Sequence, residues 1–345
     1  MPSTLPRNIH DLAGLHRWLD TNSRQRHWRH WRWQLRAALT TADLARFGLL
    51  DVAALRAAKK WPARVTPYFL FLSVLSDQSD PLTRQWLPAA AELMPDSNAR
   101  DPFDETHLMP VPGVVQRFPD RVVVLTHAAC ATTCRHCTRR HTLVQHMLVD
   151  SPARLQRVLT WLRATPSVRE VLLTGGDPLL LPNDALLRLV RAFAALPQLD
   201  AIRIGTRVPV VLPMRITPAL AHALGASHRV WVNTQFNHVR EITPDSTAAC
   251  ARLVDAGIPV SNQTVLLRGV NNSVDAMTKL CAGLQRIRVR PYYVFLCDPV
   301  RGTAHLRTSR TQARTIARGV ASRLGGLATP RFVIDLPGKP YKMPI

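Results

Sequence analysis

Acidic residues are scarce in this sequence of 345 residues. Asp and Glu number 23 against 45 Lys and Arg, which leaves a formal net charge of +22 at neutral pH. A surface of this kind attracts nucleic acid, acidic proteins or anionic cofactors. Because the arginines are spread along the chain, the charge by itself is weak evidence for any one of these partners.

Long apolar segments are missing as well. No run of about 18 apolar residues occurs, so we expect no membrane-spanning helix. The segment Met1–Arg7 lacks the apolar centre of a secretory signal peptide, which predicts a cytoplasmic protein. In a reducing compartment the six cysteines favour metal binding or catalysis over disulfides. Three of them are scattered and are expected to be ordinary buried thiols: Cys250, Cys281 and Cys297.

The other three cysteines form a dense motif. Cys130, Cys134 and Cys137 have the spacing C-x3-C-x2-C and directly follow the apolar run Arg121–Thr126. A [4Fe–4S] cluster normally takes four cysteine ligands, so three ligands leave one iron open to a small molecule. A structural zinc site is the alternative, but zinc prefers four ligands and no second C-x2–4-C pair is present. A chance arrangement of three thiols is the remaining interpretation.

From about Val114 onward, short apolar runs alternate with helical segments, which is typical of a parallel sheet. Six such units indicate an α/β fold, a partial (β/α)6 barrel. The cysteine motif then lies at the carboxyl rim of the barrel, where α/β barrels place their active sites. The predicted strands are Arg121–Thr126, Glu170–Thr174, Ala201–Gly205, Arg229–Asn233, Asn262–Leu267 and Pro291–Leu296, and the helices are expected near 152–164, 183–195, 217–224, 244–256, 274–287 and 309–324.

The segment before the predicted barrel is expected to be mostly helical. Trp28, Trp31, Leu35 and Leu39 recur at helical spacing among arginines, which favours one amphipathic helix over a nucleic-acid-binding arm. A short helix is expected near Trp86–Leu93. We therefore divide the chain into three parts: an N-terminal helical region (1–110), the barrel (111–298) and a C-terminal helix with a tail (299–345).

A glycine pair follows the second predicted strand, in Gly175-Gly176-Asp177. Paired glycines let the backbone approach a ligand closely. Together with the cysteine motif one βα unit earlier, this resembles the radical S-adenosylmethionine (SAM) enzymes, in which SAM chelates the open iron. The resemblance implies a [4Fe–4S] cluster held by the three motif cysteines, and SAM contacts from Gly175, Gly176, Asp177, His136 and Gln263.

Further motifs resemble one family, the lysine 2,3-aminomutases, over nearly the whole chain. The matching segments are Arg117–Arg121, Cys134–Arg140, Arg207–Thr217, Asn233–His238, Asn262–Asn271 and Asp335–Lys342. The resemblance implies an isomerase that moves the α-amino group of L-lysine to C3, giving β-lysine. It also implies pyridoxal 5′-phosphate (PLP) as a cofactor and a reduced flavodoxin or ferredoxin as electron donor.

Roles for individual residues follow from that resemblance. Lys342, rather than Lys339, corresponds to the lysine that binds PLP. Arg117 and Arg121 correspond to ligands of its phosphate, for which the guanidinium fork is well suited. The tail that carries Lys342 should then meet the cysteine motif across one barrel mouth.

Substrate contacts are implied in the same way. Arg139 would bind the substrate α-carboxylate, although pairing with a nearby Asp or Glu is an alternative. Asp298 and Asp335 would bracket the ε-ammonium of lysine, because two carboxylates near one buried cation satisfy its charge and hydrogen bonds together.

The sequence also departs from the longer members of that family, which carry C-terminal zinc-binding cysteines. Here the sequence stops three residues after Lys342 and Asn272-Ser273 occupies the corresponding loop, so we expect no structural zinc, and a homo-oligomer stays open. One alternative is a branch of the family that serves elongation factor P. Others are a 2,3-aminomutase for another amino acid and, more distantly, an RNA-modifying radical SAM enzyme; no specific nucleic-acid partner is expected.

Overall fold

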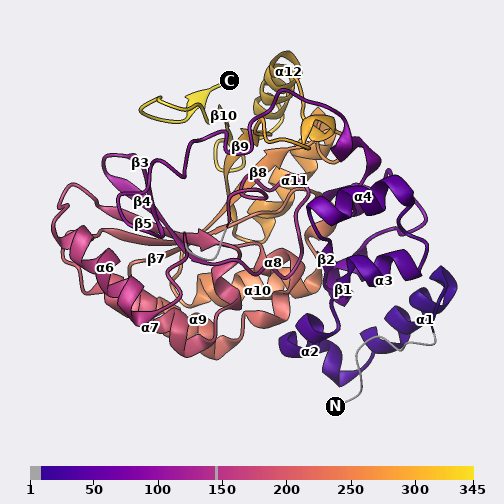
Figure 1. The fold of residues 1–345 in the computed structure, drawn as a ribbon, viewed down its shortest axis with the longest axis horizontal. Coiled ribbons are helices and arrows are strands. Elements are labelled where there is room, and N and C mark those ends of the chain that lie inside the picture. The colour runs from indigo at the N-terminus through magenta and orange to yellow at the C-terminus, as the bar shows by residue number, and fades with distance from the viewer. Residues whose placement is uncertain (1–8, 144–146) are drawn as a thin grey trace.

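A nine-stranded sheet organises the chain in this computed structural model, which describes residues 9–143 and 147–345 (Figure 1). The strand order is β11-β10-β9-β8-β7-β6-β5-β4-β3. Strands β4 to β10 run parallel, and an antiparallel strand closes each edge. The bounds are β3 (Val114–Phe118), β4 (Arg121–His127), β5 (Glu170–Gly175), β6 (Ala201–Gly205), β7 (Val230–Thr234), β8 (Val260–Leu266), β9 (Arg290–Leu296), β10 (Arg331–Ile334) and β11 (Met343–Pro344).

The six predicted strands are confirmed as β4 to β9, and the α/β class is confirmed with them. The edge strands β3, β10 and β11 were not predicted. β10 and β11 extend the same sheet past residue 298, while the division into three parts stays a prediction. β10 and β11 have only four and two residues, and such short runs carry little periodicity.

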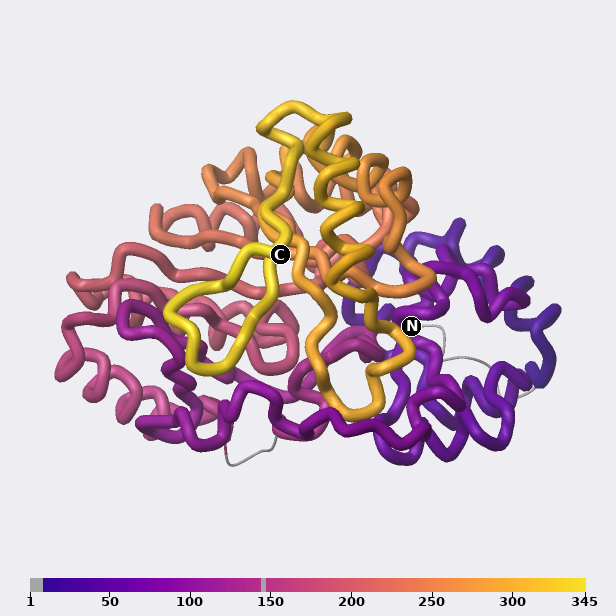
Figure 2. Tube along the Cα trace, turned by 90° about the horizontal axis from the view of Figure 1, so that it is seen from above, coloured from indigo at the N-terminus to yellow at the C-terminus, as the bar shows by residue number. Residues whose placement is uncertain are grey.

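Helices follow the parallel strands and cover the outer face of the curved sheet (Figures 1 and 2). Their bounds are α6 (Pro152–Arg163), α7 (Asn183–Ala194), α8 (Val208–Val211), α9 (Pro218–Gly225), α10 (Pro244–Asp255), α11 (Val274–Arg286) and α12 (Arg310–Ala321). The strands alternate accordingly: Val171 and Leu173 are fully buried toward the helices, whereas Leu172 and Thr174 line a cavity on the inner face.

The N-terminal region forms a separate layer at one side of the barrel, drawn in indigo in Figure 1. It contains α1 (Leu12–Ser23), α2 (Trp31–Arg36), α3 (Thr41–Arg46), α4 (Val52–Lys60), α5 (Pro67–Leu72) and a small sheet of β1 (Leu39–Thr40) with β2 (Arg64–Val65). The predominantly helical character is therefore as predicted.

The single amphipathic helix predicted through Trp28 and Leu39 is wrong. The backbone is extended at His30, with φ −91° and ψ 106°, between a 3-10 helix (Arg26–Arg29) and α2. Trp33, absent from the predicted stripe, is buried between the rings of Trp18 and Trp28, each with its centroid 5.9 Å away. Tertiary packing of the tryptophans thus overrides the local period.

The helix predicted near Trp86–Leu93 is also wrong. Two 3-10 helices, Thr83–Gln85 and Ala90–Leu93, flank Pro88 instead. Proline lacks the backbone N–H that a continuous helix needs, so the chain is interrupted there.

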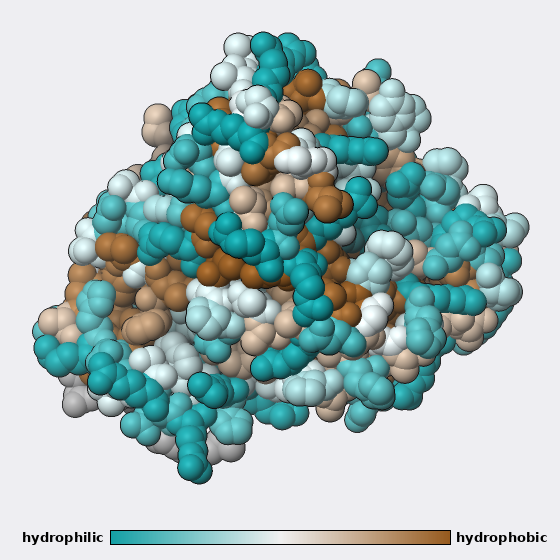
Figure 3. Space-filling view, turned by 180° about the vertical axis from the view of Figure 1, so that it is seen from behind, coloured by the Kyte–Doolittle hydropathy of each residue, from teal (hydrophilic) through white to brown (hydrophobic). Residues whose placement is uncertain are grey.

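Among the described residues, none of the helices has both the length and the apolar character that crossing a membrane requires. Figure 3 shows hydrophilic side chains over much of one face of the molecule.

Candidate active site

One cavity of about 660 Å³ gathers the predicted site residues. It lies on the inner face of the sheet, toward the carboxyl ends of the parallel strands. The cysteine loop and the C-terminal tail both line it, as expected for segments that meet across one barrel mouth. All predicted residues border it: Arg117, Arg121, Cys130, Cys134, His136, Cys137, Arg139, Gly175, Gly176, Asp177, Gln263, Asp298, Asp335 and Lys342.

The three motif cysteines lie on the loop after β4 and carry free thiols. Burial raises the pKa of Cys137 to about 11 and also raises that of Cys130. Within residues 9–143 and 147–345, no group of three or more His, Cys, Asp or Glu side chains could hold a single metal ion. A cluster does not need such convergence, because each thiolate binds a different iron. Three thiols on one loop at one cavity therefore fit a cluster better than a mononuclear site.

A buried network of ion pairs anchors the cysteine loop to Glu92 in the N-terminal region. Arg135 donates Nε and Nη2 to the two carboxylate oxygens of Glu92 at 2.9 and 2.6 Å, and Arg140 Nη2 donates to Glu92 at 2.6 Å. Burial alone would raise the pKa of Glu92, but the two arginines hold it below its usual value. Removing one partner from such a buried network leaves an uncompensated charge, so Glu92 is structurally important for the cysteine loop.

A second buried arginine reaches the sulfur itself. Arg207, in the loop after β6, donates Nη1 to Cys134 Sγ at 3.0 Å and Nη2 to Glu241 at 2.9 Å and to Gln85. A fixed positive charge beside this sulfur would offset the negative charge of a metal-bound thiolate. Arg207 lies in a segment that resembled the family, but sequence reasoning assigned no role to it, to Gln85 or to Glu241.

The glycine pair at the end of β5 packs against the backbone that precedes Cys130. Gly176 N donates to His127 O at 2.5 Å, and Asp177 N donates to Ala129 O at 2.9 Å. Gly175 has φ +113°, and a Cβ placed on Gly176 would lie 2.2 Å from Ala129 O. Glycine is required here because the two backbones touch.

Asp177 uses both carboxylate oxygens inside the protein. They accept from the Thr206 hydroxyl at 2.6 Å, Arg207 N at 2.8 Å and Leu179 N at 3.1 Å. Burial nevertheless raises the pKa of Asp177. These bonds tie the loop after β5 to the loop after β6, and a contact between Asp177 and SAM stays a prediction.

Replacement of Gly176 by alanine should lower both stability and cluster loading. The added Cβ forces the β5 end away from the cysteine loop, at a cost of about 1–3 kcal/mol of unfolding free energy. Thermal unfolding and iron content after reconstitution measure the two effects. Gly326→Ala is the matched control, because nothing lies within 4 Å of its Cβ position. Equal iron content in the two variants would contradict the proposed packing role.

His136, between two of the motif cysteines, is buried against Gln235. The Gln235 Nε2 and His136 Nε2 atoms are 2.8 Å apart, while His136 Nδ1 has no hydrogen-bond partner among the described residues. Burial, with a smaller effect from Arg207, lowers the pKa of His136 to about 3, so its ring is neutral. An unpaired polar atom at this cavity is available to a ligand, and Gln263 lines the same cavity.

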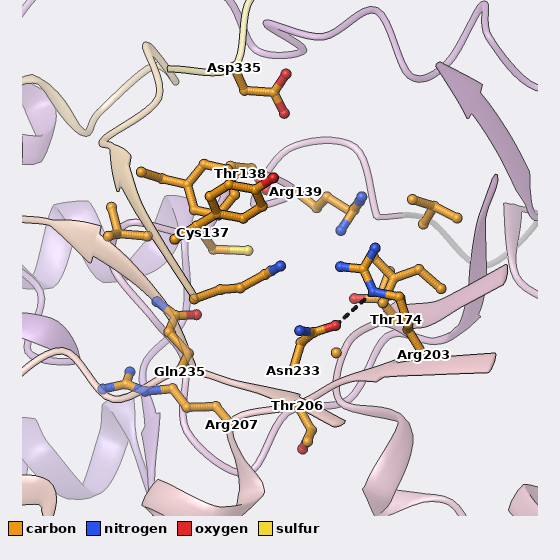
Figure 4. Close-up of a pocket in the computed structure, with 18 of the residues that line it drawn as sticks. Cys137, Thr138, Arg139, Thr174, Arg203, Thr206, Arg207, Asn233, Gln235 and Asp335 are labelled. Carbon is orange, nitrogen blue, oxygen red and sulfur yellow. Dashed lines mark hydrogen bonds between the residues drawn. The ribbon is translucent and has the colours of Figure 1, made fainter. Parts of the chain in front are cut away.

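The far side of the cavity is built around Asp335, which Figure 4 shows opposite Arg203 and Arg207. Lys342 Nζ donates to Asp335 at 2.9 Å, and Arg117 forms a two-pronged pair with the same carboxylate at 2.8 and 3.1 Å. Burial would raise the pKa of Asp335, but the two cations hold it below its usual value. Lys342 Nζ also lies 5.1 Å from the centroid of the Phe295 ring. The lysine is thus held inside the cavity, whereas Lys339 is exposed.

The remaining predicted residues have individual environments. Asp298 is half-buried near Asp335, and partial burial together with that second carboxylate raises its pKa to about 7. Arg139 pairs with Glu105 through Nε and Nη2, both at 2.7 Å. Arg121 pairs with the neighbouring Asp120 and is half exposed.

Sequence reasoning missed the polar floor of the cavity. Arg203 donates to Asn233 at 2.7 Å and to Glu170 at 2.5 Å, as the dashed line in Figure 4 marks for Asn233. The rings of Tyr292 and Tyr293 line the same cavity, with their centroids 3.9 Å apart and their planes tilted by 34°. The sequence did contain an indication of this floor. Glu170 and Arg203 are charged residues within predicted strands, and a charged side chain in such a strand points to the face that is not packed against helices.

Similarity to known proteins agrees with these features. Residues 124–281 match the radical SAM superfamily. The chain is 41% identical over 324 residues to an L-lysine 2,3-aminomutase of Clostridium subterminale. The aligned region covers 92% of this chain and 78% of that protein. An L-lysine 2,3-aminomutase of Fusobacterium nucleatum is 39% identical, with 92% and 76% covered. The chain belongs to the lysine 2,3-aminomutase family.

The family also includes a more distant relative with another substrate in its name. A glutamate 2,3-aminomutase of Clostridioides difficile is 34% identical over 94% of this chain and 78% of its own length. A solved radical SAM methyltransferase from Sphaerobacter thermophilus has a TM-score of 0.42 at 17% identity, covering 64% of this chain and 68% of that one. Aminomutases are isomerases, so this member of the lysine 2,3-aminomutase family is a radical SAM isomerase.

Proposed function

We propose that this enzyme converts L-lysine to β-lysine by moving the amino group from C2 to C3. The observation that carries the proposal is a pair of carboxylates, buried Asp335 and half-buried Asp298, across one cavity from the cysteine loop. Two acidic groups suit a substrate whose side chain ends in a cation, whereas a glutamate side chain would be repelled there.

The residues of the cavity fit three cofactors. Cys130, Cys134 and Cys137 would hold the [4Fe–4S] cluster, and the glycine pair, His136 and Gln263, which line the same cavity, would contact SAM. Lys342 would hold PLP, with Arg117 and Arg121 near its phosphate. When bound, the cluster and SAM supply a radical that removes a hydrogen atom, and PLP supplies a conjugated system that stabilises the radical during migration.

The chain itself positions the substrate and excludes water. Arg139 has one guanidinium edge paired with Glu105, so its Nη1 is available for the substrate α-carboxylate. Asp298 and Asp335 would accept from the substrate ε-ammonium at the other end. Asp335 is paired with Lys342 and Arg117 in this structure, and it would become available to the substrate if Lys342 held PLP and Arg117 held its phosphate. Holding both ends of the substrate fixes C2 and C3 relative to the cofactors.

Anaerobic reconstitution tests the function directly. The protein is loaded with iron, sulfide and PLP, then given SAM, dithionite and L-lysine, and the product is examined for β-lysine. L-glutamate and L-arginine serve as competing substrates in matched reactions. Turnover of either of these with none of lysine would overturn the substrate assignment, and absence of 5′-deoxyadenosine would overturn the radical chemistry.

Glu105→Gln should weaken recognition of the substrate carboxylate. A neutral amide cannot form the charged two-pronged pair, so Arg139 loses its fixed orientation, and we expect KM for L-lysine to rise about tenfold with a smaller change in kcat. The preference for L-lysine over L-lysine amide should shrink in parallel, because the amide lacks the negative charge that Arg139 reads. Glu105→Asp keeps the charge and should restore part of the preference. An unchanged preference in Glu105→Gln would exclude this role.

Binding of lysine should depend on pH through Asp298. Its raised pKa of about 7 means that the carboxylate is mostly neutral at pH 6 and mostly ionised at pH 8, despite the opposing charges of Lys342, Arg117 and Arg307. Affinity for the ammonium should therefore rise about tenfold between pH 6 and 8. Lysine titrations of the PLP-loaded protein measure it, and Asp298→Asn should bind weakly with no such dependence. A flat wild-type profile would contradict the assignment.

The proposal also includes an electron donor and a cellular location. Reduction of the cluster calls for a one-electron donor, for which a reduced flavodoxin or ferredoxin is the expected class, and we place the reaction in the cytoplasm. The oligomeric state stays open.

A further inference from the structure

The excess positive charge is concentrated in the layer formed by α2 to α5. Between Thr21 and Ser76 the sequence has ten Arg and Lys and only two acidic residues, Asp43 and Asp51. Both acids are engaged, since Asp43 caps α3 through Thr40 and Asp51 accepts from Ala54 N at the start of α4. About one sixth of the chain thus carries more than a third of its net charge.

This basic layer forms the back wall of the cysteine loop. Trp61, directly after α4, donates its indole Nε1 to the backbone carbonyl of Cys134 at 3.2 Å. Arg135 Nη1 donates to Trp61 O at 2.9 Å, and Thr133 N donates to Arg64 O at 2.8 Å. Three consecutive residues of the loop therefore contact the segment Trp61–Arg64. Trp61, the residue that follows α4, is therefore in direct contact with the loop that would hold a cluster.

The outer face of α4 presents unpaired charge next to that contact. Ala54, Ala57 and Ala58 pack inward, while the cationic side chains of Arg56, Lys59 and Lys60 are exposed. Neither Lys59 nor Lys60 has an ion-pair partner within the described ranges. Figure 1 shows α4 at the edge of the molecule, away from α6 and α7. Uncompensated charges of one sign on a free helix face attract and orient a partner of opposite charge.

Two classes of partner carry the negative charge that this face would attract: nucleic acids and acidic proteins. The exposure of aromatic rings near α4 distinguishes between them. A nucleic-acid site would offer exposed aromatic rings on which bases stack. α4 itself has no aromatic residue, and of the tryptophans before it Trp28 and Trp33 are only 5% and 2% exposed, while Trp31 is half-buried with the Arg32 guanidinium 4.5 Å from its ring centroid. The α4 face therefore has charge without a stacking platform, which favours an acidic protein.

We propose that the exposed face of α4 with Trp61 is the docking site of a small acidic protein that delivers one electron to the cluster. The inference rests on the proposed function, which requires a reduced cluster. The donor loses one electron, and the cluster passes from the 2+ to the 1+ state with no bond made or broken in this chain. Docking at α4 places the donor against the segment that is hydrogen-bonded to Cys134.

Charge reversal on α4 tests the site. The reconstituted Lys59→Glu/Lys60→Glu variant is mixed with flavodoxin hydroquinone at low salt, and bleaching of the cluster absorbance is followed by stopped flow. We expect the second-order rate constant to fall about tenfold or more, with the difference disappearing at high salt. Lys59→Gln/Lys60→Gln should give an intermediate loss. Photoreduced deazaflavin, a small reductant that needs no docking, should reduce all variants equally.

The matched control carries the same charge change on a different helix, α12. Arg314→Glu/Arg318→Glu alters two exposed residues of α12, and it should reduce the flavodoxin rate less than twofold. Equal losses in the two double variants would overturn the site. Tight, α4-dependent binding of single-stranded RNA, with an unchanged flavodoxin rate, would assign the face to nucleic acid instead. Because dithionite is a small reductant that needs no docking site, the lysine assay with dithionite distinguishes failure of this proposal from failure of the proposed function.

Discussion

Lys342→Ala is expected to lose lysine turnover by about a thousandfold or more, together with the visible absorbance of lysine-bound PLP. The side chain reaches the cavity beside Asp335 and lies near the Phe295 ring, so no neighbouring amine replaces it. The measurement combines β-lysine formation with the absorbance spectrum of the PLP-loaded protein and its mass after borohydride reduction.

Lys339→Ala is the matched control, because Lys339 is exposed on the same tail three residues away. It should keep the absorbance band and most of the activity. A borohydride adduct on Lys339, or an unchanged band in Lys342→Ala, would remove the assignment of Lys342. Cluster content and SAM cleavage should be similar in both variants, since neither lysine contacts the cysteine loop.

Cys134→Ala should abolish the cluster and, with it, formation of both 5′-deoxyadenosine and β-lysine. Two thiols on the loop leave two irons without protein ligands, and Arg207 then faces the site with no sulfur partner. Iron and sulfide analysis, the cluster absorbance near 400 nm and the detection of 5′-deoxyadenosine measure the loss. PLP binding to Lys342 should persist, because that residue lies on the far side of the cavity.

Cys281→Ala provides the control for a lost thiol. Cys281 lies on α11 in the apolar core, where burial raises its pKa to about 12, and it should tolerate the change with a modest loss of stability. Full iron content in Cys134→Ala, or loss of the cluster in Cys281→Ala, would contradict the assignment of the ligands.

Much of the fold could be predicted because its signal is local. In each strand from β4 to β9, alternate residues pack against helices, and the apolar runs were therefore visible in the sequence. The failures occurred where distant contacts outweigh local pattern. Trp33 is buried by Trp18 and Trp28 although it does not share their helical face, and the short strand β10 is formed by pairing with β9.

The candidate site divides in the same way. The three cysteines, the glycine pair and the tail lysine could be proposed from the sequence because each belongs to a contiguous motif, and all of them line one cavity, while their roles stay predictions. The side chains with which these site residues form ion pairs and hydrogen bonds could not be predicted from the sequence. Arg117 pairs with Asp335, 218 positions away, and Arg207 reaches Cys134 across 73 positions, since only the strand order brings these loops together.

The sequence by itself determined the chemistry that this chain carries: a three-cysteine loop after a buried strand, and a lysine in a motif near the other end. Tertiary structure alone decided that both face one cavity, that Glu105 holds Arg139, and that α4 lies behind Cys134. The physical reason is that periodicity and spacing act within a few turns of chain, whereas ion pairs, pKa values and docking faces depend on which strands become neighbours.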